Sequence, residues 1–172
     1  MREALNLEQL KALLHKPTQR DYLPCPLVLN GIPRGAISEI SGNGKTQFVA
    51  NLLIENPELK VAWIEDQFSV NPFGLQQRKV KPHRIIYVEA GHQTEWAAIQ
   101  ALRAQVFHIV VLYAEFQNIR TLRRIQLASE KANAATLWLT PQPQVFWTST
   151  VQLKVSKGNK KNELDILTLK RK

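Results

Sequence analysis

Cysteine and long apolar runs are what this chain of 172 residues most plainly lacks. Its single cysteine, Cys25, excludes an internal disulfide, so we expect a cytoplasmic location. Cys25 stands between Pro24 and Pro26 and is predicted to be unreactive. No stretch approaches the roughly 18 consecutive apolar residues that a membrane-spanning helix needs, and the first residues lack the apolar core of a signal peptide. We therefore expect no membrane association.

Clustered metal ligands are also missing. The four histidines, His15, His83, His92 and His108, share no metal-ligand spacing, and we predict no metal site. Acidic residues are in the minority, with 14 Asp and Glu against 23 Lys and Arg, which gives a net charge of +9. That balance favours an acidic partner, either nucleic acid or an acidic protein surface.

The basic excess is concentrated near the C-terminal end. Seven basic residues stand there against Glu163 and Asp165; they are Lys154, Lys157, Lys160, Lys161, Lys170, Arg171 and Lys172. One interpretation is contact with DNA phosphates, which would make binding salt-dependent with a slope of roughly −0.9 per contact. The other is a solubilising tail that docks on an acidic partner. Aromatic residues for stacking on single strands are sparse there, although Phe146 and Trp147 precede the cluster.

Strand-like and helix-like segments alternate through the middle of the chain. Strands are predicted at residues 36–40, 60–64, 84–88, 108–113 and 135–139. Helices are predicted at 45–56, 95–105 and 118–133, with a short one after Asn71-Pro72. This rhythm is typical of an α/β fold with a mostly parallel sheet and helices on both faces.

The two ends of the chain depart from that rhythm. Leucines recur at helical spacing in residues 5–14, which predicts an N-terminal helix and a proline-rich lead-in over 1–30. One domain then follows over 31–172. Strand-like runs at 145–155 and 163–170 flank the turn signal Gly158-Asn159, so we expect an antiparallel hairpin to close this domain.

A shortened phosphate-binding motif lies between the first strand and the first helix of the alternation. The segment is Ser41-Gly42-Asn43-Gly44-Lys45-Thr46. A complete motif has four residues between its two glycines, whereas only Asn43 separates Gly42 from Gly44. A loop that short has too few N–H groups to encircle a phosphate. Gly42, Gly44, Lys45 and Thr46 therefore have two interpretations, a weak site for ATP, ADP or phosphate, or a remnant that merely starts a helix.

Hydrolysis of ATP also needs a metal-binding carboxylate at the end of a core strand and a group that orients water. The strand 108–113 ends in Leu112-Tyr113, and Glu115 follows two residues later. Carboxylates do follow the strand 60–64, at Glu65-Asp66. We expect a degenerate phosphate loop in a protein that is not an enzyme, with no required cofactor.

At this point the residues resemble the RecA core. Gly31-Ile32-Pro33-Arg34-Gly35, followed by the strand 36–40 and Gly42, is similar to the RecA segment that leads into the phosphate loop. Residues 63–72 resemble the strand and loop that carry the catalytic glutamate of RecA. In that register Gln67 replaces the glutamate, Asn71 replaces the adenine-side aspartate and Leu112 replaces the metal-binding aspartate. The resemblance therefore implies a RecA-like pseudo-ATPase.

A closer resemblance is to ImuA, a RecA-like and SulA-related family of bacterial mutagenic translesion synthesis. It is carried by residues 96–103, by the helix Leu122-Arg123-Arg124-Ile125-Gln126-Leu127-Ala128-Ser129-Glu130, and by the basic run 167–171. The retained Gly44-Lys45-Thr46 departs from many relatives and leaves residual nucleotide binding open.

The resemblance implies partners and not a reaction. They are an ImuB-type polymerase-like protein, an error-prone DnaE-type polymerase complex, and RecA, acting in DNA repair during the SOS response to DNA damage. Two alternatives remain open. One is a SulA-like inhibitor of the division protein FtsZ, and the other is a weak RecA-like DNA-dependent ATPase.

Two groups of side chains remain to be assigned. On the helix 118–133, Arg120, Arg123 and Arg124 lie on neighbouring parts of one surface, which is either a solvated face or a contact for a partner or DNA. Trp63, Trp96 and Trp138 are predicted to be buried, because they lie on predicted buried strands or on an inward helix face.

Overall fold

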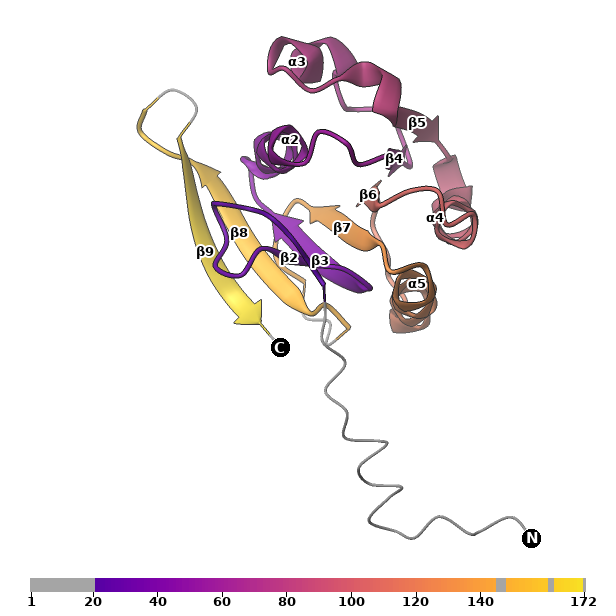
Figure 1. Ribbon diagram of the computed structural model, residues 1–172. Coiled ribbons are helices and arrows are strands. Elements are labelled where there is room, and N and C mark those ends of the chain that lie inside the picture. The colour runs from indigo at the N-terminus through magenta and orange to yellow at the C-terminus, as the bar shows by residue number, and fades with distance from the viewer. Residues whose placement is uncertain (1–20, 145–147, 161–162, 172) are drawn as a thin grey trace, which may run out of the picture.

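The computed structural model describes residues 21–144, 148–160 and 163–171 of the chain (Figure 1). Its strands are β1 (Tyr22–Leu23), β2 (Ile32–Pro33), β3 (Ala36–Ser41), β4 (Val61–Glu65), β5 (Ile85–Glu89), β6 (Ile109–Tyr113), β7 (Ala135–Thr140), β8 (Val151–Lys157) and β9 (Leu164–Arg171). Its helices are α2 (Lys45–Glu55), α3 (Pro72–Gln77), α4 (Thr94–Arg103) and α5 (Ile119–Ala132), with short 3₁₀ turns η1 (Pro82–Arg84) and η2 (Gly91–Gln93).

Seven of these strands form one sheet in the order β5-β4-β6-β7-β3-β8-β9. Every neighbouring pair is parallel except β8 and β9, which pair antiparallel. The predicted α/β class, with a mostly parallel sheet and an antiparallel hairpin at the C-terminal end, is therefore confirmed. The hairpin begins later than expected, because β8 starts at Val151 and not at residue 145.

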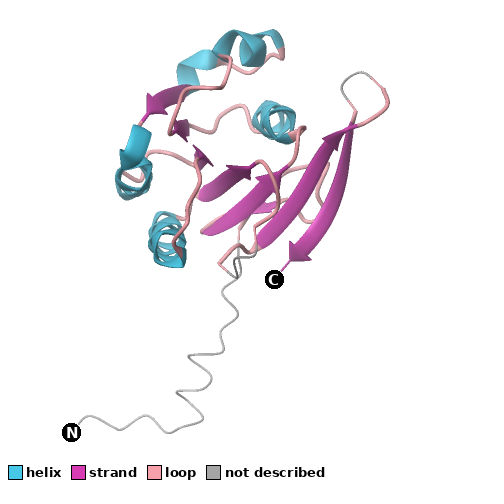
Figure 2. Ribbon diagram, turned by 180° about the vertical axis from the view of Figure 1, so that it is seen from behind, coloured by secondary structure: helices cyan, strands magenta, loops and turns pink. Residues whose placement is uncertain are grey.

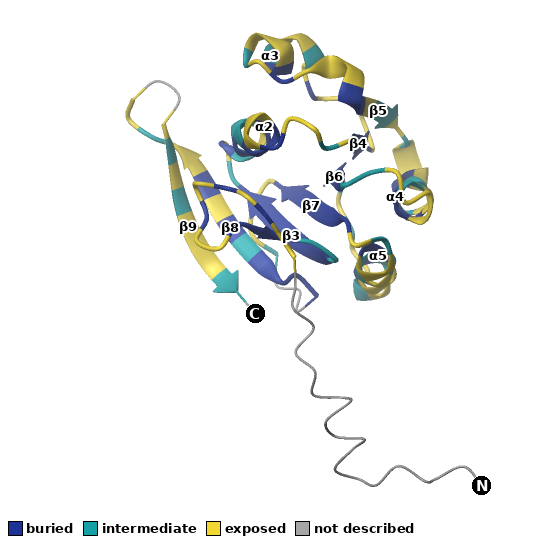
Figure 3. Cartoon of the chain, viewed as in Figure 1, coloured by how far each residue is buried: buried dark blue, intermediate teal, exposed yellow. Residues whose placement is uncertain are grey.

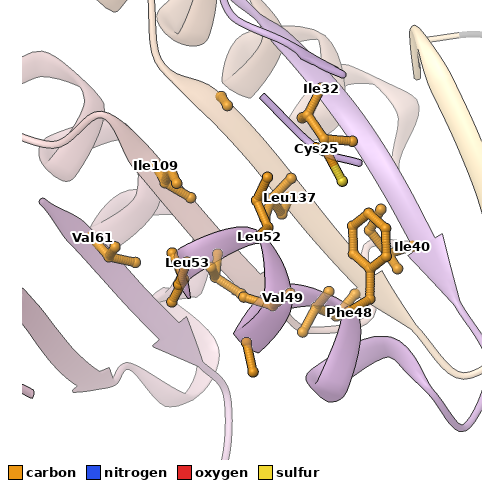
Figure 4. Close-up of a cluster of buried hydrophobic side chains, with 14 of the residues drawn as sticks. Cys25, Ile32, Ile40, Phe48, Val49, Leu52, Leu53, Val61, Ile109 and Leu137 are labelled. Atoms are coloured by element: carbon orange, nitrogen blue, oxygen red, sulfur yellow. The ribbon is translucent and has the colours of Figure 1, made fainter. Parts of the chain in front are cut away.

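The first face of the sheet is covered by α2 and by the lead-in before β3. Phe48, Val49 and Leu52 of α2 are fully buried against strand residues such as Ile40 and Leu137 (Figure 4). Cys25 joins this cluster from the lead-in, and its burial raises the pKa of the thiol. The burial of the Cys25 side chain agrees with the low reactivity predicted for it.

The second face is covered by α4 and α5, and the view from behind shows both helices lying against the sheet (Figure 2). Leu122 and Ile125 of α5 are fully buried with Ile99 and Leu102 of α4. Trp138 of β7 is buried in the same cluster. In Figure 3 the strands β3 and β7 are almost entirely dark blue, because helices and loops cover both faces of the middle of the sheet.

Two buried charged side chains hold loops onto this framework. Arg84 donates from its guanidinium to the carbonyls of Leu53, Asn56 (2.5 Å) and Leu59 (3.2 Å), and so caps the C-terminal end of α2. Burial lowers the pKa of Arg84. Glu39, 1% exposed in β3, accepts hydrogen bonds from Gln152 Nε2 (2.7 Å), the Gln144 N–H (2.6 Å) and Thr140 Oγ1 (3.2 Å).

Some predictions fall outside the described residues or are wrong. The N-terminal helix at 5–14, Lys161, Lys172 and the segment 145–147 with Phe146 and Trp147 lie outside the described ranges. Trp63 and Trp138 are buried as predicted, but Trp96 is 61% exposed. The inward face of α4 consists of Thr94, Ala98, Ile99 and Leu102, and Trp96 points away from it. Over the described ranges, α2 to α5 are too short or too polar to span a bilayer.

Candidate functional site

The shortened phosphate loop lies at the carboxyl end of β3 and leads directly into α2. Gly42 has a φ of +96°, a left-handed conformation that a residue with a side chain rarely adopts. A Cβ at Gly42 would lie 2.3 Å from the carbonyl oxygen of Val155 in β8. A Cβ at Gly44 would lie 2.8 Å from Val155 Cγ1 and 2.9 Å from Leu164 Cδ2. The close approach of the β8–β9 hairpin therefore requires a glycine at position 42, whereas at position 44 the side chains of Val155 and Leu164 would have to move.

Hydrogen bonds join the loop to β8 as if the pairing of β3 with β8 continued past the end of β3. The Gly44 N–H donates to the Val155 carbonyl at 3.1 Å, and the Lys157 N–H donates to Asn43 Oδ1 at 3.2 Å. Just before the loop, Ser41 Oγ donates to the Leu153 carbonyl at 3.1 Å. A phosphate cradle needs its loop N–H groups directed at the ligand. Here the Gly44 N–H is directed at a neighbouring strand.

The loop lysine also has its partners within the chain. Lys45 Nζ lies 3.4 Å from the Gly42 carbonyl oxygen and 5.1 Å from the centre of the Tyr113 ring. The negative face of an aromatic ring attracts an ammonium group. Partial burial lowers the pKa of Lys45. Thr46, the next residue, is exposed in the first turn of α2.

Of the last two residues of β6, Tyr113 contacts the lysine and Leu112 does not. Leu112 is fully buried in the cluster beneath α4 and α5, on the opposite face of the sheet from α2. Alternation along a strand places Tyr113 on the α2 face. The side chain of β6 that lies against Lys45 is therefore a tyrosine and not a carboxylate.

The carboxylate of Glu65, at the end of β4, is occupied by the loop that follows it. It is 1% exposed and accepts hydrogen bonds from Trp63 Nε1 (2.8 Å), the Val70 N–H (3.1 Å) and the Ser69 N–H and hydroxyl. Asn71 accepts from the Gly74 N–H at 3.1 Å and caps α3. Glu65 and Asn71 therefore shape the connection from β4 to α3.

Gln67 and Glu115 line a different feature, an open cavity of about 530 Å³ at the carboxyl ends of β4, β5 and β6. Asp66 and Glu95 add two further carboxylates to its wall. The loop residues 41–46 contribute nothing to this lining. Glu115 therefore lines a cavity to which Lys45 does not contribute.

The basic residues predicted to contact a partner divide between two parts of the molecule. Arg120, Arg123 and Arg124 are exposed on α5, where Arg124 forms an ion pair with Glu95 and Arg123 donates to Gln126 at 3.0 Å. Lys154, Lys157, Lys160, Lys170 and Arg171 lie in the β8–β9 hairpin, which forms one edge of the sheet away from α5 (Figures 1 and 2).

Within the hairpin the basic side chains differ in exposure. Lys154, Lys157 and Lys160 are exposed, and Lys170 and Arg171 are half-buried. Arg171 lies over the Tyr22 ring at 5.6 Å and donates to the Gly31 carbonyl at 3.4 Å. Arg171 therefore ties β9 to the lead-in, and sequence reasoning missed this contact because it joins the two ends of the described chain.

Comparison with known proteins identifies the fold of the chain but not the family to which it belongs. No protein-family model matches the chain, and no curated protein matches its sequence. Among solved structures, the crystal structure of the RadB recombinase is similar, with a TM-score of 0.67 over 83% of this chain and 84% of that one. The two sequences are 13% identical. The chain therefore has a RecA-like fold.

Proposed function

We propose that this chain is a non-catalytic RecA-like accessory protein of mutagenic translesion synthesis. Its partners would be an ImuB-type polymerase-like protein, the error-prone DnaE-type polymerase complex and RecA. The observation that carries the proposal is the hydrogen bond from the Gly44 N–H to the Val155 carbonyl. It commits a central amide of the phosphate loop to the protein's own sheet.

The residues at this loop do not provide the groups that would bind a nucleoside triphosphate with Mg²⁺. Lys45 is held by a carbonyl oxygen and by the Tyr113 ring, and the buried Glu65 is held by its own loop. Gln67 offers a neutral amide where a RecA-type ATPase has its glutamate. We therefore derive no hydrolytic step, and we assign the scaffold a role in binding other proteins.

The identity of the partners rests on the resemblance to ImuA and on the placement of its most specific segment. That segment, 122–130, forms the middle of α5. Leu122 and Ile125 are buried, whereas Arg123, Arg124 and Leu127 are exposed. Packing in the core explains why Leu122 and Ile125 are apolar, but it does not explain the three exposed residues. Their presence supports a contact surface on this helix.

Co-purification tests the proposal. The full chain is expressed with an ImuB-type protein and, separately, with RecA, and each complex is purified through a tag on the partner. We expect a stable complex with the ImuB-type protein that Arg123→Glu with Arg124→Glu weakens, while Lys154→Glu with Lys157→Glu serves as the charge-matched control. Failure of the unaltered chain to bind either partner would remove the proposal.

A further inference from the structure

A groove of about 450 Å³ runs between α4 and α5 on the outer side of the molecule. Its floor is apolar, formed by Ile99 and Leu102 of α4 and by Ala128 and Ala132 of α5. The two alanines leave the space open, because a longer side chain at either position would fill it. In Figure 3 the outward turns of both helices are yellow or teal, which marks exposed and partly buried residues.

The rim of the groove is basic. Arg103 lies on the α4 side, and Arg124 and Lys131 lie on the α5 side. Arg124 is paired with Glu95 at one end of the groove. Among the residues that the structure describes, neither Arg103 nor Lys131 forms an ion pair. Two positive charges therefore flank the apolar floor without a neutralising carboxylate.

One exposed apolar side chain of α5 extends the floor of the groove. Leu127, which lines the groove, is 48% exposed. On α5, Leu127 lies between Arg124 and Lys131 at spacings of three and four residues, so the three form one ridge.

An apolar floor between helices with basic rims is complementary to an amphipathic helix that carries carboxylates beside its apolar stripe. We propose that the α4–α5 groove binds an acidic amphipathic helix of a partner protein. Apolar side chains of that helix lie on the floor and against Leu127, and its carboxylates pair with Arg103 and Lys131. The proposal rests on the assigned role as a protein-binding accessory and gives that role a surface.

Two other occupants fit the groove less well. The chain's own segment 1–20 is leucine-rich, but it has four basic residues (Arg2, Lys11, Lys16 and Arg20) against Glu3 and Glu8. Its net positive charge opposes the basic rim. Nucleic acid is bound through phosphate contacts and stacking on aromatic rings. The groove floor consists of aliphatic side chains and offers no ring.

The test uses the full chain and a labelled synthetic peptide. The peptide carries leucines at positions i, i+3, i+4 and i+7 and glutamates beside this stripe, and a scrambled peptide has the same composition without the stripe. Binding is measured by fluorescence anisotropy. We expect the amphipathic peptide to bind and the scrambled one to bind at least about tenfold more weakly, a difference of about 1.4 kcal/mol.

Variants locate the site. Leu127→Glu and Lys131→Glu should each weaken peptide binding about tenfold or more. The charge-reversed controls Lys154→Glu and Lys157→Glu, on the far hairpin, should change it less than about twofold. Circular dichroism should be unchanged in all four, because each of these side chains is exposed.

Three outcomes would overturn the proposal. They are equal binding of the scrambled peptide, equal losses in the hairpin controls, and binding of a single-stranded oligonucleotide, but not the peptide, that Lys131→Glu abolishes. The proposed function fails independently of these results. The peptide contains no sequence from an ImuB-type protein or from RecA, so it can bind even if neither of them co-purifies with the chain.

Discussion

Replacing Gly42 by alanine probes the contact between the phosphate loop and β8. The new Cβ would lie 2.3 Å from the Val155 carbonyl oxygen, a backbone atom that cannot rotate away. Gly91 provides the matched control, because it also has a positive φ, +53°, but nothing lies within 4 Å of its added Cβ. Both substitutions impose backbone strain, and only Gly42→Ala adds a collision.

The expected magnitudes follow from that difference. A left-handed conformation costs a residue with a side chain roughly 1–2 kcal/mol, and Gly91→Ala should lose about that much free energy of unfolding. Gly42→Ala must also displace β8, which disturbs the hydrogen bond between the Gly44 N–H and the Val155 carbonyl, worth about 1 kcal/mol. Overpacking against Val155 adds roughly 1–3 kcal/mol. We expect a total loss of about 3–6 kcal/mol for Gly42→Ala.

Urea unfolding followed by tryptophan fluorescence measures both variants, because Trp63 and Trp138 are buried in the native protein. The difference between the two variants should be at least about 2 kcal/mol. Equal losses for Gly42→Ala and Gly91→Ala would refute the reasoning, since they would mean that the loop is not pressed against β8.

Three further predictions concern polar groups, two of them buried and one partly exposed. Arg84→Met should lower the free energy of unfolding by about 3 kcal/mol in the same assay, because it leaves buried carbonyls at the end of α2 without their donor; Arg103→Met, at an exposed position, should change it by less than about 0.5 kcal/mol. Glu39→Gln should cost about 2 kcal/mol, because an NH₂ group replaces an oxygen that accepts from Gln152 or its neighbours; an unchanged urea midpoint would contradict the role given to Glu39. His108 accepts from a backbone N–H through Nδ1, and burial, with the nearby charges of two basic residues, lowers its pKa. Its contribution to stability is therefore complete above the unfolded value of about 6.5 and is lost as the pH falls through the folded pKa, so His108→Asn should flatten the decline measured between neutral and mildly acidic pH.

The order of the central elements could be read from the sequence because each has a strong local signal. Strands such as β6, Ile109-Val110-Val111-Leu112-Tyr113, are apolar runs that a sheet covered on both faces requires. Asn118 caps α5 by accepting from the Arg120 N–H at 2.8 Å, as its position before the helix indicated. These features depend on residues close together in the chain.

Contacts between distant segments could not be predicted in the same way. The hairpin itself has a local turn signal at Gly158, but the parallel pairing of β8 with β3 does not. That pairing brings Val155 onto Gly42 and Gly44 across more than 100 residues of chain. The shortened loop therefore suggested poor phosphate binding without showing that a strand of the same protein approaches it.

Trp96 and Glu39 show two ways in which the local sequence failed to predict the surroundings of a side chain. Trp96 was expected in the core because it was placed on the inward face of its helix, but the helix phase set by Ala98 and Leu102 directs it outward. Glu39 interrupts a buried strand, and a carboxylate there required hydrogen-bond donors. The donors, Gln144 and Gln152, come from segments that sequence reasoning could not place beside β3.

Calorimetric titration of the full chain with Mg-ATP and Mg-ADP at millimolar concentration tests the central claim most directly, because the loop amide and the loop lysine are both engaged within the protein. The account predicts no saturable heat with either nucleotide, and no difference between the unaltered chain and Lys45→Ala. Saturable binding that Lys45→Ala abolishes would show that the loop opens to a phosphate, and would contradict it.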